Sequence, residues 1–463
     1  MVQGVEIKDD FIQNTNPASG ELILPLVKVT TSSELTAVLR ASSSAQPAWA
    51  ALDLAARVKL IRAGLVSLEP QAEELAALIT EEMGKVMSES REEVGEALGL
   101  KDSWLDMVEE ANKELCFEND SGDSQSIVVR DPLGCVAVIS PWNYPVGEIA
   151  LLALPALVAG NSVIVKPSEV SPLSAERFCE TLARCLPSGV LQLVHGDGRV
   201  GSELVSSTHV NMVCMTGSTE TGKKIMQSCA SDLKRLILEL GGKDPLIVFS
   251  DADLEKAAKD TVAYSLANAG QVCCAVERVF VEESVKARFE ERVVAYAREW
   301  KVGPGTEETS KLGPMVSQTQ LSIVEDQVKH ALDVGATLLF ESEIPDDKRG
   351  NWAPVRVMTD LDQSMRILKE ETFGPIISLS SFDGSEDEAV RLANDSEYGL
   401  CSYVYSNDVS KAARVGRRIN SGQIGINCYS LACAQPQCPW VSQTGVVASS
   451  KRFDSQMPFP DRP

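Results

Sequence analysis

The chain has 463 residues, which is too long for one ordinary hydrophobic core, so we expect two or more large domains. Hydrophobic residues make up 44% of the chain and charged residues 24%, as is usual for a globular protein. The formal net charge of -23 argues against nucleic acid or an anionic membrane as a partner and otherwise serves solubility.

The cysteines and the N-terminal residues indicate a cellular compartment. Twelve cysteines are spread along the chain, and in a protein of this length we expect reduced thiols rather than a disulfide framework. Residues 1–10 are neither basic nor continuously apolar, so no secretory signal is expected. The longest apolar run, residues 149–160, is too short to span a bilayer and contains Pro155. The prediction is a cytoplasmic protein.

The first quarter of the chain has helical patterns. Ser33 can cap a first helix, and further helices are predicted over residues 54–78, interrupted near Pro70, and 88–115. A turn-rich polar stretch follows at residues 117–125, and residues 126–130 are typical of a strand.

From residue 135 onward, strands and helices alternate, which is typical of a parallel α/β sheet. The predicted strands are residues 135–140, 162–165, 190–194, 212–215, 245–249, 278–282, 402–405 and 424–427, with one more near 376. The predicted helices are residues 147–158, 174–184, 254–268 and 285–300, with another that begins at Thr219. Because the alternation restarts after Gly242, we expect two α/β domains.

A thiol and a carboxylate stand in two glycine-marked segments. Cys273 follows Gly270, and Glu239 comes shortly before Gly241. Alone, each is open to a structural interpretation, since a cysteine after an apolar helix usually packs in a core and a buried glutamate can be ion-paired. Together they indicate a covalent catalyst in which the thiolate attacks and the carboxylate handles protons. In an extended segment the side chains of Cys273 and Cys274 would point to opposite faces, so only one of the two thiols could face a site.

Asn143 follows the strand predicted at residues 135–140. Its amide either holds a turn ahead of Pro145 or donates a hydrogen bond to a developing oxyanion. Together with the thiol and the carboxylate, this asparagine suggests an enzyme that passes through a thioester.

Two further segments suggest nucleotide binding. Lys166 ends a strand and Glu169 follows it. An acid in that place can accept hydrogen bonds from ribose hydroxyls, and it would repel a 2'-phosphate. Gly217 and Ser218 precede a predicted helix, whose first amides favour a phosphate. The spacing Gly-Ser-x-x-x-Gly differs from the usual dinucleotide fingerprint, so this segment is weak evidence when taken alone.

Six segments together resemble the aldehyde dehydrogenase superfamily, in the family's order and spacing, from about residue 12 to Trp440. They are residues 141–145 (Pro-Trp-Asn-Tyr-Pro), 166–169 (Lys-Pro-Ser-Glu), 217–222 (Gly-Ser-Thr-Glu-Thr-Gly), 239–243 (Glu-Leu-Gly-Gly-Lys), 270–273 (Gly-Gln-Val-Cys) and 371–375 (Glu-Thr-Phe-Gly-Pro). The resemblance implies NAD-dependent, non-acylating oxidation of a small-molecule aldehyde to its carboxylic acid.

The resemblance also implies an aldehyde-dehydrogenase-like α/β fold. A Rossmann-like NAD-binding domain would comprise residues 1–116 and 132–242, an oligomerisation arm residues 117–131, and an α/β catalytic domain residues 243–440. Residues 441–463 would form an atypical C-terminal tail. A homodimer or tetramer is expected.

Site roles follow from the resemblance residue by residue. Cys273 would be the nucleophile, Glu239 the general base, and Asn143 would form the oxyanion hole with the backbone N–H of Cys273. The cofactor residues would be Lys166, Ser168 and Glu169 near the adenosine ribose, Gly217 and Ser218 at the pyrophosphate, Glu371 at the nicotinamide ribose, and Trp142 and Phe373 along the cleft. No metal site is expected, because Cys428, Cys433 and Cys438 are spaced more widely than zinc ligands usually are.

The chain departs from the family after Trp440. Residues 441–447 lack the family's glycine pair and lysine, and Pro458 and Pro460 argue against a closing strand. This segment is expected to alter subunit assembly and to open one wall of the substrate tunnel.

Side chains expected at the tunnel mouth give limited information on the substrate. They are Gly147, Glu148, Leu151, Leu431, Ala432 and Cys433. The helix after Asn143 has no arginine, which argues against a carboxylated semialdehyde, and Leu151 suggests an apolar wall. Glu148 either attracts a cationic aldehyde or is a solvated helix carboxylate, and the second interpretation is favoured.

Two other functions stay open. In a CoA-acylating enzyme, CoA rather than water would take the acyl group, and Glu239 argues against it because a water-activating base serves hydrolysis. A catalytically impaired member with a binding or structural role is the other alternative, against which Cys273, Glu239 and Asn143 all argue.

Overall fold

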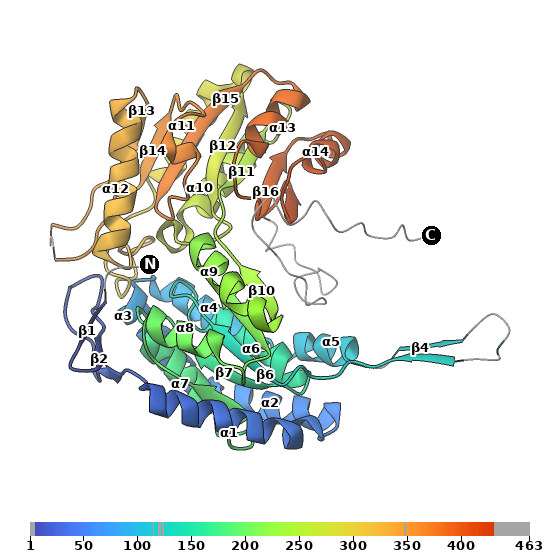
Figure 1. Cartoon of the computed structure of the whole chain (residues 1–463). Helices are drawn as coiled ribbons and strands as arrows, with labels where there is room; N and C mark the ends of the chain where they lie inside the picture. Colours follow the sequence, from blue (N-terminus) through green and yellow to red (C-terminus); the bar gives the residue numbers. More distant parts are fainter. Residues whose placement is uncertain (1–4, 114, 119–121, 123–124, 347–348, 430–463) are drawn as a thin grey trace.

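The structure is a computed structural model that describes residues 5–113, 115–118, 122, 125–346 and 349–429. Two large α/β units lie one above the other, and a long two-stranded hairpin projects from the lower one (Figure 1). The unit drawn in yellow and orange contains a seven-stranded sheet, and the unit drawn in blue and green contains a five-stranded sheet.

The first sheet has five parallel strands in the order β10-β9-β6-β7-β8. They are β6 (Cys135–Ile139), β7 (Ser162–Lys166), β8 (Leu191–Leu193), β9 (Met212–Thr216) and β10 (Arg235–Glu239). The chain order reverses at β6, with β7 and β8 on one side and β9 and β10 on the other. Ligands of open α/β sheets bind beyond the carboxyl ends of the strands at such a reversal.

Helices cover this sheet on both faces, which explains why β7 is fully buried. The helices of this unit are α1 (Ser32–Ala50), α2 (Leu54–Leu68), α3 (Ala72–Met83), α4 (Met87–Gly99), α5 (Ser103–Ala111), α6 (Gly147–Val158), α7 (Pro172–Ala183), α8 (Gly198–Ser206) and α9 (Thr219–Cys229). The break predicted near Pro70 is confirmed as a short 3-10 turn, Glu69–Gln71.

The predicted cap of the first helix is wrong. Thr31, not Ser33, is the N-cap of α1, because its side chain accepts a hydrogen bond from the Glu34 backbone N–H. The Glu34 carboxylate accepts the Thr31 N–H in return, at 2.8 Å. This reciprocal capping box satisfies two backbone donors, which Ser33 inside the first turn could not do.

The second sheet has seven strands in the order β13-β14-β15-β12-β11-β16-β17, and only the β13–β14 pair is antiparallel. The strands are β11 (Asp244–Val248), β12 (Val276–Glu282), β13 (Thr337–Glu341), β14 (Arg356–Thr359), β15 (Ile376–Phe382), β16 (Cys401–Tyr405) and β17 (Gln423–Ile426). Its helices are α10 (Leu254–Leu266), α11 (Lys286–Ala297), α12 (Gln318–Asp333), α13 (Glu386–Asn394) and α14 (Val409–Gly416).

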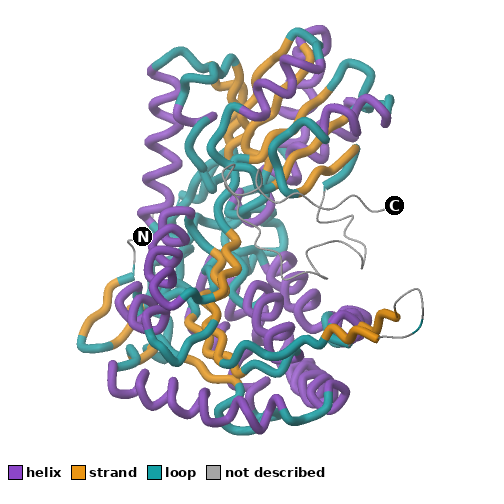
Figure 2. The backbone as a smooth tube through the Cα atoms, turned by 45° about the vertical axis from the view of Figure 1, so that its right-hand side comes forward, coloured by secondary structure: helices purple, strands orange, loops and turns teal. Residues whose placement is uncertain are grey.

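Two small antiparallel elements complete the described chain. β1 (Glu6–Lys8), β2 (Phe11–Gln13) and β3 (Val27–Lys28) form one sheet. β4 (Leu115–Glu118) and β5 (Gln125–Val128) form the hairpin that extends away from the body in both views (Figure 2). No helix among the described residues is long and apolar enough to cross a membrane. The predictions for residues 431–463, including those for Trp440 and the tail, lie outside the described residues.

Candidate active site

The six sequence segments converge between the two sheets. Asn143 follows β6, Gly217 follows β9, and Glu239 ends β10. Cys273 precedes β12 in the second sheet, and the Asn143 Nδ2 donates a hydrogen bond to the carbonyl of Gln271 across this boundary at 3.0 Å. The residues predicted to attack, to hold the oxyanion and to transfer protons therefore come from both sheets.

The backbone before Cys273 is strained. Asn268, Ala269 and Gly270 have φ values of +50°, +56° and +72°, three consecutive residues in the left-handed region. A Cβ at Gly270 would lie 2.1 Å from the carbonyl oxygen of Gly374, so only glycine fits there. Backbone strain of this kind is found mainly where a functional loop must hold one shape.

The two adjacent thiols lie in a turn, so the prediction of an extended segment is wrong. The Ala275 N–H donates to the Val272 carbonyl at 3.0 Å and closes the turn around Cys273 and Cys274. Cys273 is half-buried, whereas Cys274 is only 3% exposed and its Sγ lies 2.9 Å from the Tyr429 hydroxyl. Cys273 is thus the more exposed of the two cysteines.

The surroundings of Cys273 oppose its ionisation. Hydrogen bonding with Cys274, burial and the negative charges of Glu148 and Glu239 raise the pKa of the Cys273 thiol well above its usual range. The thiol is therefore protonated near neutral pH and has to lose its proton before it can attack.

Asn143 is held against the cysteine loop. Its Nδ2 bond to Gln271 is accompanied by two bonds from Asn268, whose Nδ2 donates to the carbonyls of Gln271 at 3.1 Å and Asn143 at 3.3 Å. Gln271 is fixed in turn, because its Oε1 accepts the Val316 N–H at 2.9 Å. The bond to Gln271 uses one of the two amide hydrogens of Asn143, and the second can serve an oxyanion.

Glu239 is buried at the carboxyl end of β10. Burial, and then the negative charge of Glu148, raise the pKa of Glu239 to about 8. Glu148 is half-buried on the first turn of α6, where its Oε2 accepts a hydrogen bond from Thr216 Oγ1 at 2.9 Å. The favoured prediction of a solvated carboxylate at position 148 is therefore wrong, because the side chain turns into the site.

The residues predicted around the adenosine ribose end β7. Lys166 is almost fully buried, and its Nζ donates to the Pro167 carbonyl at 2.9 Å and lies 3.4 Å from Glu169 Oε2. Ser168 holds the turn, because its Oγ accepts the Val170 N–H at 3.2 Å. The Glu169 carboxylate remains one-quarter exposed at the edge where the sheet order reverses.

The residues predicted at the pyrophosphate lie across β6 from Lys166. Ser218 is the N-cap of α9, and its Oγ accepts the Thr221 N–H at 3.3 Å. Gly217 is anchored beside it, because its N–H donates to the Glu239 carbonyl at 2.9 Å. An exposed helix N-terminus at the sheet reversal suits a phosphate group.

The residues predicted beside the nicotinamide meet the glycine pair after Glu239. The Glu371 Oε1 accepts the Gly242 N–H at 3.0 Å, and a Cβ on Gly241 would lie 2.3 Å from the Glu371 carboxylate. Burial raises the pKa of Glu371 to about 8. The rings of Trp142 and Phe373 pack edge to face with centroids 5.5 Å apart. These side chains and the α9 terminus fit an adenine dinucleotide placed along the sheet edge.

Sequence reasoning missed a buried charge network at the start of α4, formed by Lys85 just before the helix and by carboxylates on it. Lys85 Nζ lies 2.6 Å from Glu93 and 3.5 Å from the centre of the Tyr144 ring. Glu93 Oε1 accepts the N–H groups of Val146 at 2.9 Å and Gly147 at 3.0 Å. The next carboxylate on the same helix face, Glu89, accepts the Asn268 N–H at 2.8 Å and so reaches the cysteine loop.

A sequence signal for this network existed. Glu89 and Glu93 are four residues apart, so they share one face of a helix that also presents the buried Val94. Two acids on an otherwise apolar stripe call for a cation, and Lys85 stands one turn earlier.

We expect Lys85→Met to destabilise the fold strongly, because it leaves the Glu93 carboxylate buried without its cation. The expected loss in the free energy of unfolding is about 3–5 kcal/mol, measured by urea denaturation. Arg91→Met is the matched control, since the ion pair that Arg91 of α4 makes with Glu73 of α3 is exposed. Equal losses for the two variants would contradict a structural role for the buried pair.

Comparison with known proteins places this arrangement in a family. A sequence model described as the Aldehyde dehydrogenase family matches residues 5–449. The glutarate-semialdehyde dehydrogenase of Pseudomonas putida is 35% identical over 421 residues, which is 90% of this chain and 86% of that protein. The NADP(+) succinate-semialdehyde dehydrogenase GabD of Escherichia coli is 35% identical over 423 residues, with the same coverage of 90% and 86%.

A solved structure agrees with these relatives. Betaine aldehyde dehydrogenase of Staphylococcus aureus, in complex with NAD+, superposes with a TM-score of 0.85 at 33% identity, covering 90% of this chain and 83% of that one. The chain belongs to the aldehyde dehydrogenase family, and it is an NAD(P)-dependent enzyme that oxidises an aldehyde to the acid. The fold and the resemblance predicted from the sequence are confirmed.

Proposed function

We propose that the enzyme uses NAD and hydrolyses a thioester formed on Cys273. The observation that carries this proposal is the position of Glu239, a buried carboxylate whose pKa is raised to about 8 and whose charge acts on the Cys273 thiol. A base of this strength beside a nucleophile suits the activation of water near neutral pH.

The proposed reaction has an acylation half and a hydrolysis half. Cys273 releases its proton to solvent, and its sulfur forms a bond to the aldehyde carbon. The oxyanion receives hydrogen bonds from Asn143 and from the Cys273 N–H, each worth about 3 kcal/mol in the transition state. Loss of hydride from the thiohemiacetal carbon leaves a thioester on Cys273, and NAD, when bound, would supply the hydride acceptor. Glu239 then takes a proton from water as the water oxygen attacks the thioester and the carbon–sulfur bond breaks.

For the cofactor residues we propose the same roles that the sequence predicts. Lys166 and Glu169, with Ser168 shaping their turn, would hold the adenosine ribose. Gly217 and Ser218 would hold the pyrophosphate, Glu371 the nicotinamide ribose, and Trp142 and Phe373 would line the cleft. The named relatives are of both kinds, NADP(+) in Escherichia coli and NAD+ in Staphylococcus aureus.

Preference for NAD is proposed to depend on Glu169. We expect Glu169→Gln to raise the ratio of kcat/KM for NADP to that for NAD by about tenfold, because the negative charge no longer faces the 2'-phosphate. Steady-state rates with each cofactor measure this ratio. An unchanged ratio would remove Glu169 as the selecting residue.

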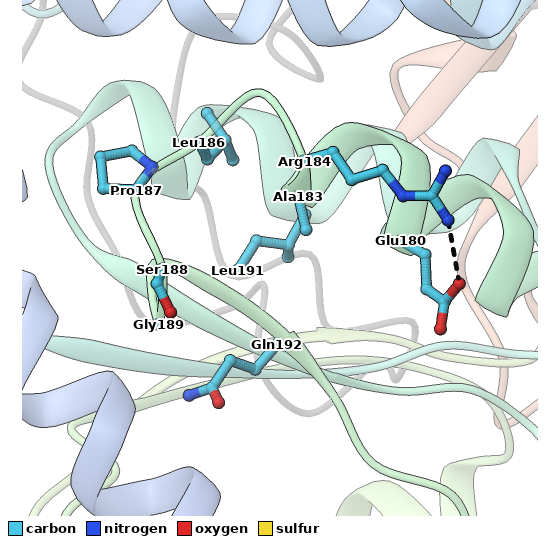
Figure 3. A pocket seen from close by; sticks show the side chains of 9 residues that line it. All are labelled: Glu180, Ala183, Arg184, Leu186, Pro187, Ser188, Gly189, Leu191 and Gln192. Atoms are coloured by element: carbon cyan, nitrogen blue, oxygen red, sulfur yellow. Dashed lines mark ion pairs between the residues drawn. The ribbon is translucent and has the colours of Figure 1, made fainter.

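Glu180→Gln is the matched control for charge removal. Glu180 lies on α7, in a surface depression of about 550 Å³ between α7 and β8, where its carboxylate pairs with Arg184 at 3.7 Å (Figure 3). The α7–β8 connection lies at the amino edge of the parallel sheet, opposite the cofactor residues. This variant should retain the wild-type ratio.

The substrate is proposed to be an aldehyde without a carboxylate. α6 has no arginine along Gly147–Val158, and it places Glu148 in the site instead. A carboxylated semialdehyde would meet a like charge there, which opposes binding. Two of the relatives are named for carboxylated semialdehydes, glutarate semialdehyde and succinate semialdehyde. The proposed substrate of this chain belongs to a different class.

One assay separates the proposal from its alternatives. The enzyme is mixed with NAD and a simple aliphatic aldehyde, with and without CoA, and NADH and the acyl product are followed. We expect NADH and free acid in both mixtures. An acyl-CoA product would favour the acylating alternative, and no NADH in either mixture would favour a catalytically impaired protein.

Domain boundaries and assembly are part of the proposal. We propose that residues 1–116 with 132–242 bind the cofactor, that residues 243–440 form the catalytic domain, and that the arm at 117–131 mediates a homodimer or tetramer. The exposed Ile127, Val128 and Val129 on the projecting hairpin support this role for the arm, since an isolated strand pair rarely exposes such side chains without a partner.

A further inference from the structure

A second carboxylate lies beside the proposed base. Thr216 and Glu239 are register partners on the neighbouring parallel strands β9 and β10. Paired residues of adjacent parallel strands direct their side chains to the same face, about 5 Å apart. Because the Thr216 hydroxyl donates to Glu148 Oε2 at 2.9 Å, the Glu148 carboxylate is brought to the side of Glu239 by the residue next to it.

The charged groups around Glu148 and Glu239 are mostly negative. Burial, and then the charge of Glu93 on α4, act against ionisation of Glu148, while the Thr216 hydrogen bond favours it, and the pKa of Glu148 is raised overall. The described charged or titratable groups that face the pair are Glu93 from α4 and the Cys273 thiol from the cysteine loop. Lys85, in the loop just before α4, is the nearby cation, and it is already paired with Glu93 at 2.6 Å.

We propose that Glu148 and Glu239 form a carboxylate pair, bridged through Thr216, that holds one proton while the site is at rest. Glu148 is thereby a positioning residue that acts through Glu239 and sets the pH at which Glu239 can take a proton from water. This inference rests on the proposed hydrolysis of a thioester by Glu239.

The sign of the effect follows from the hydrogen bond. The negative charge of Glu148 is one of the causes that raise the pKa of Glu239, so the two carboxylates cannot ionise independently and titrate as a unit. The hydroxyl of Thr216 stabilises the charge on Glu148, which leaves the shared proton on Glu239. Removing the charge at position 148 therefore allows Glu239 to ionise at lower pH.

The test isolates hydrolysis from the chemistry of the thiol. Wild-type enzyme is acylated on Cys273 with an activated ester, and the rate at which the acyl-enzyme hydrolyses is measured between pH 5 and pH 9 by the release of acid. The acylated thiol cannot titrate, so the acid limb of this profile reports the carboxylate pair alone. We expect the midpoint of the acid limb to fall at a pH about one unit lower in Glu148→Gln than in the wild type.

Three further variants sharpen the result. Glu148→Asp keeps the charge and should keep the acid limb nearer to the wild-type position. Thr216→Val removes the bridging donor, so it should move the limb in the same direction as Glu148→Gln even if the latter folds poorly. Glu180→Gln should reproduce the wild-type profile, because its carboxylate lies on the surface at the other edge of the sheet.

Several outcomes would overturn the pair. Coincident acid limbs for wild type, Glu148→Gln and Thr216→Val would show that Glu239 titrates alone. An unmoved limb with a changed ratio of kcat/KM for an amino aldehyde over an aliphatic one would instead assign Glu148 to substrate binding. A wild-type enzyme that fails to oxidise aldehydes with NAD would overturn the proposed function itself, which the first assay detects independently.

Discussion

We expect Cys273→Ser to lower the rate of NADH formation by about 10³-fold or more, and Cys274→Ser to keep most of the activity. The hydroxyl of serine is a much weaker nucleophile than a thiolate, so the variant should attack the aldehyde far more slowly. Cys274 is buried against the Tyr429 hydroxyl, which directs its thiol away from solvent. Steady-state rates with NAD and an aliphatic aldehyde measure both variants.

The paired substitutions control for each other, since both remove one sulfur from the same turn. Circular dichroism and thermal unfolding should show that the two variants are folded alike. Full activity in Cys273→Ser together with loss of activity in Cys274→Ser would reverse the assignment of the nucleophile.

Glu239→Gln is expected to stop the reaction after the thioester forms. Water is then no longer activated, and kcat should fall by about 10²–10⁴-fold. Attack by the thiol is spared, because the charge of Glu239 is one of the causes that raise the pKa of Cys273, and the amide removes it. Rapid mixing with NAD and aldehyde should therefore give a burst of about one NADH per active site, followed by slow turnover.

The pH dependence gives the same assignment a second test. Glu239 serves as a base only when it is ionised, and its pKa is raised to about 8, so hydrolysis in the wild type should accelerate as the pH rises toward 8. Below that pH the carboxyl is protonated and hydrolysis should slow. A wild-type rate of hydrolysis that stays flat from pH 6 to pH 9, or a Glu239→Gln variant without a burst, would contradict the role of Glu239.

The strands of the two parallel sheets were largely predictable. Continuous apolar runs such as residues 135–139 have to be buried on both faces, and a run of that length between turn signals has few other solutions. β10 and the helices α12 to α14 were not anticipated. The sequence of β10 includes Arg235 and Glu239, and the three helices carry mixed polar faces, so neither has the apolar pattern on which the prediction depends.

The sequence by itself determined the order of the six segments, and hence the family, and it supplied the proposed nucleophile and the proposed base. Those features are local, since each depends on a short run of residues with a fixed spacing. The turn that contains Cys273 was not predicted, because Asn268 in its left-handed segment is held by distant residues, the Asn143 carbonyl and the Glu89 carboxylate.

Only the tertiary structure decided which carboxylates enter the site. Glu148 would be solvated on an isolated helix, and it is drawn inward because β9 presents the Thr216 hydroxyl at its side. Glu93 lies some fifty residues before Val146 and Gly147, whose N–H groups it accepts. Its carboxylate can be buried because these two N–H groups and the Lys85 ammonium stabilise its charge. The energy of a buried charge depends on partners far away in the chain, so it cannot be read from the local sequence.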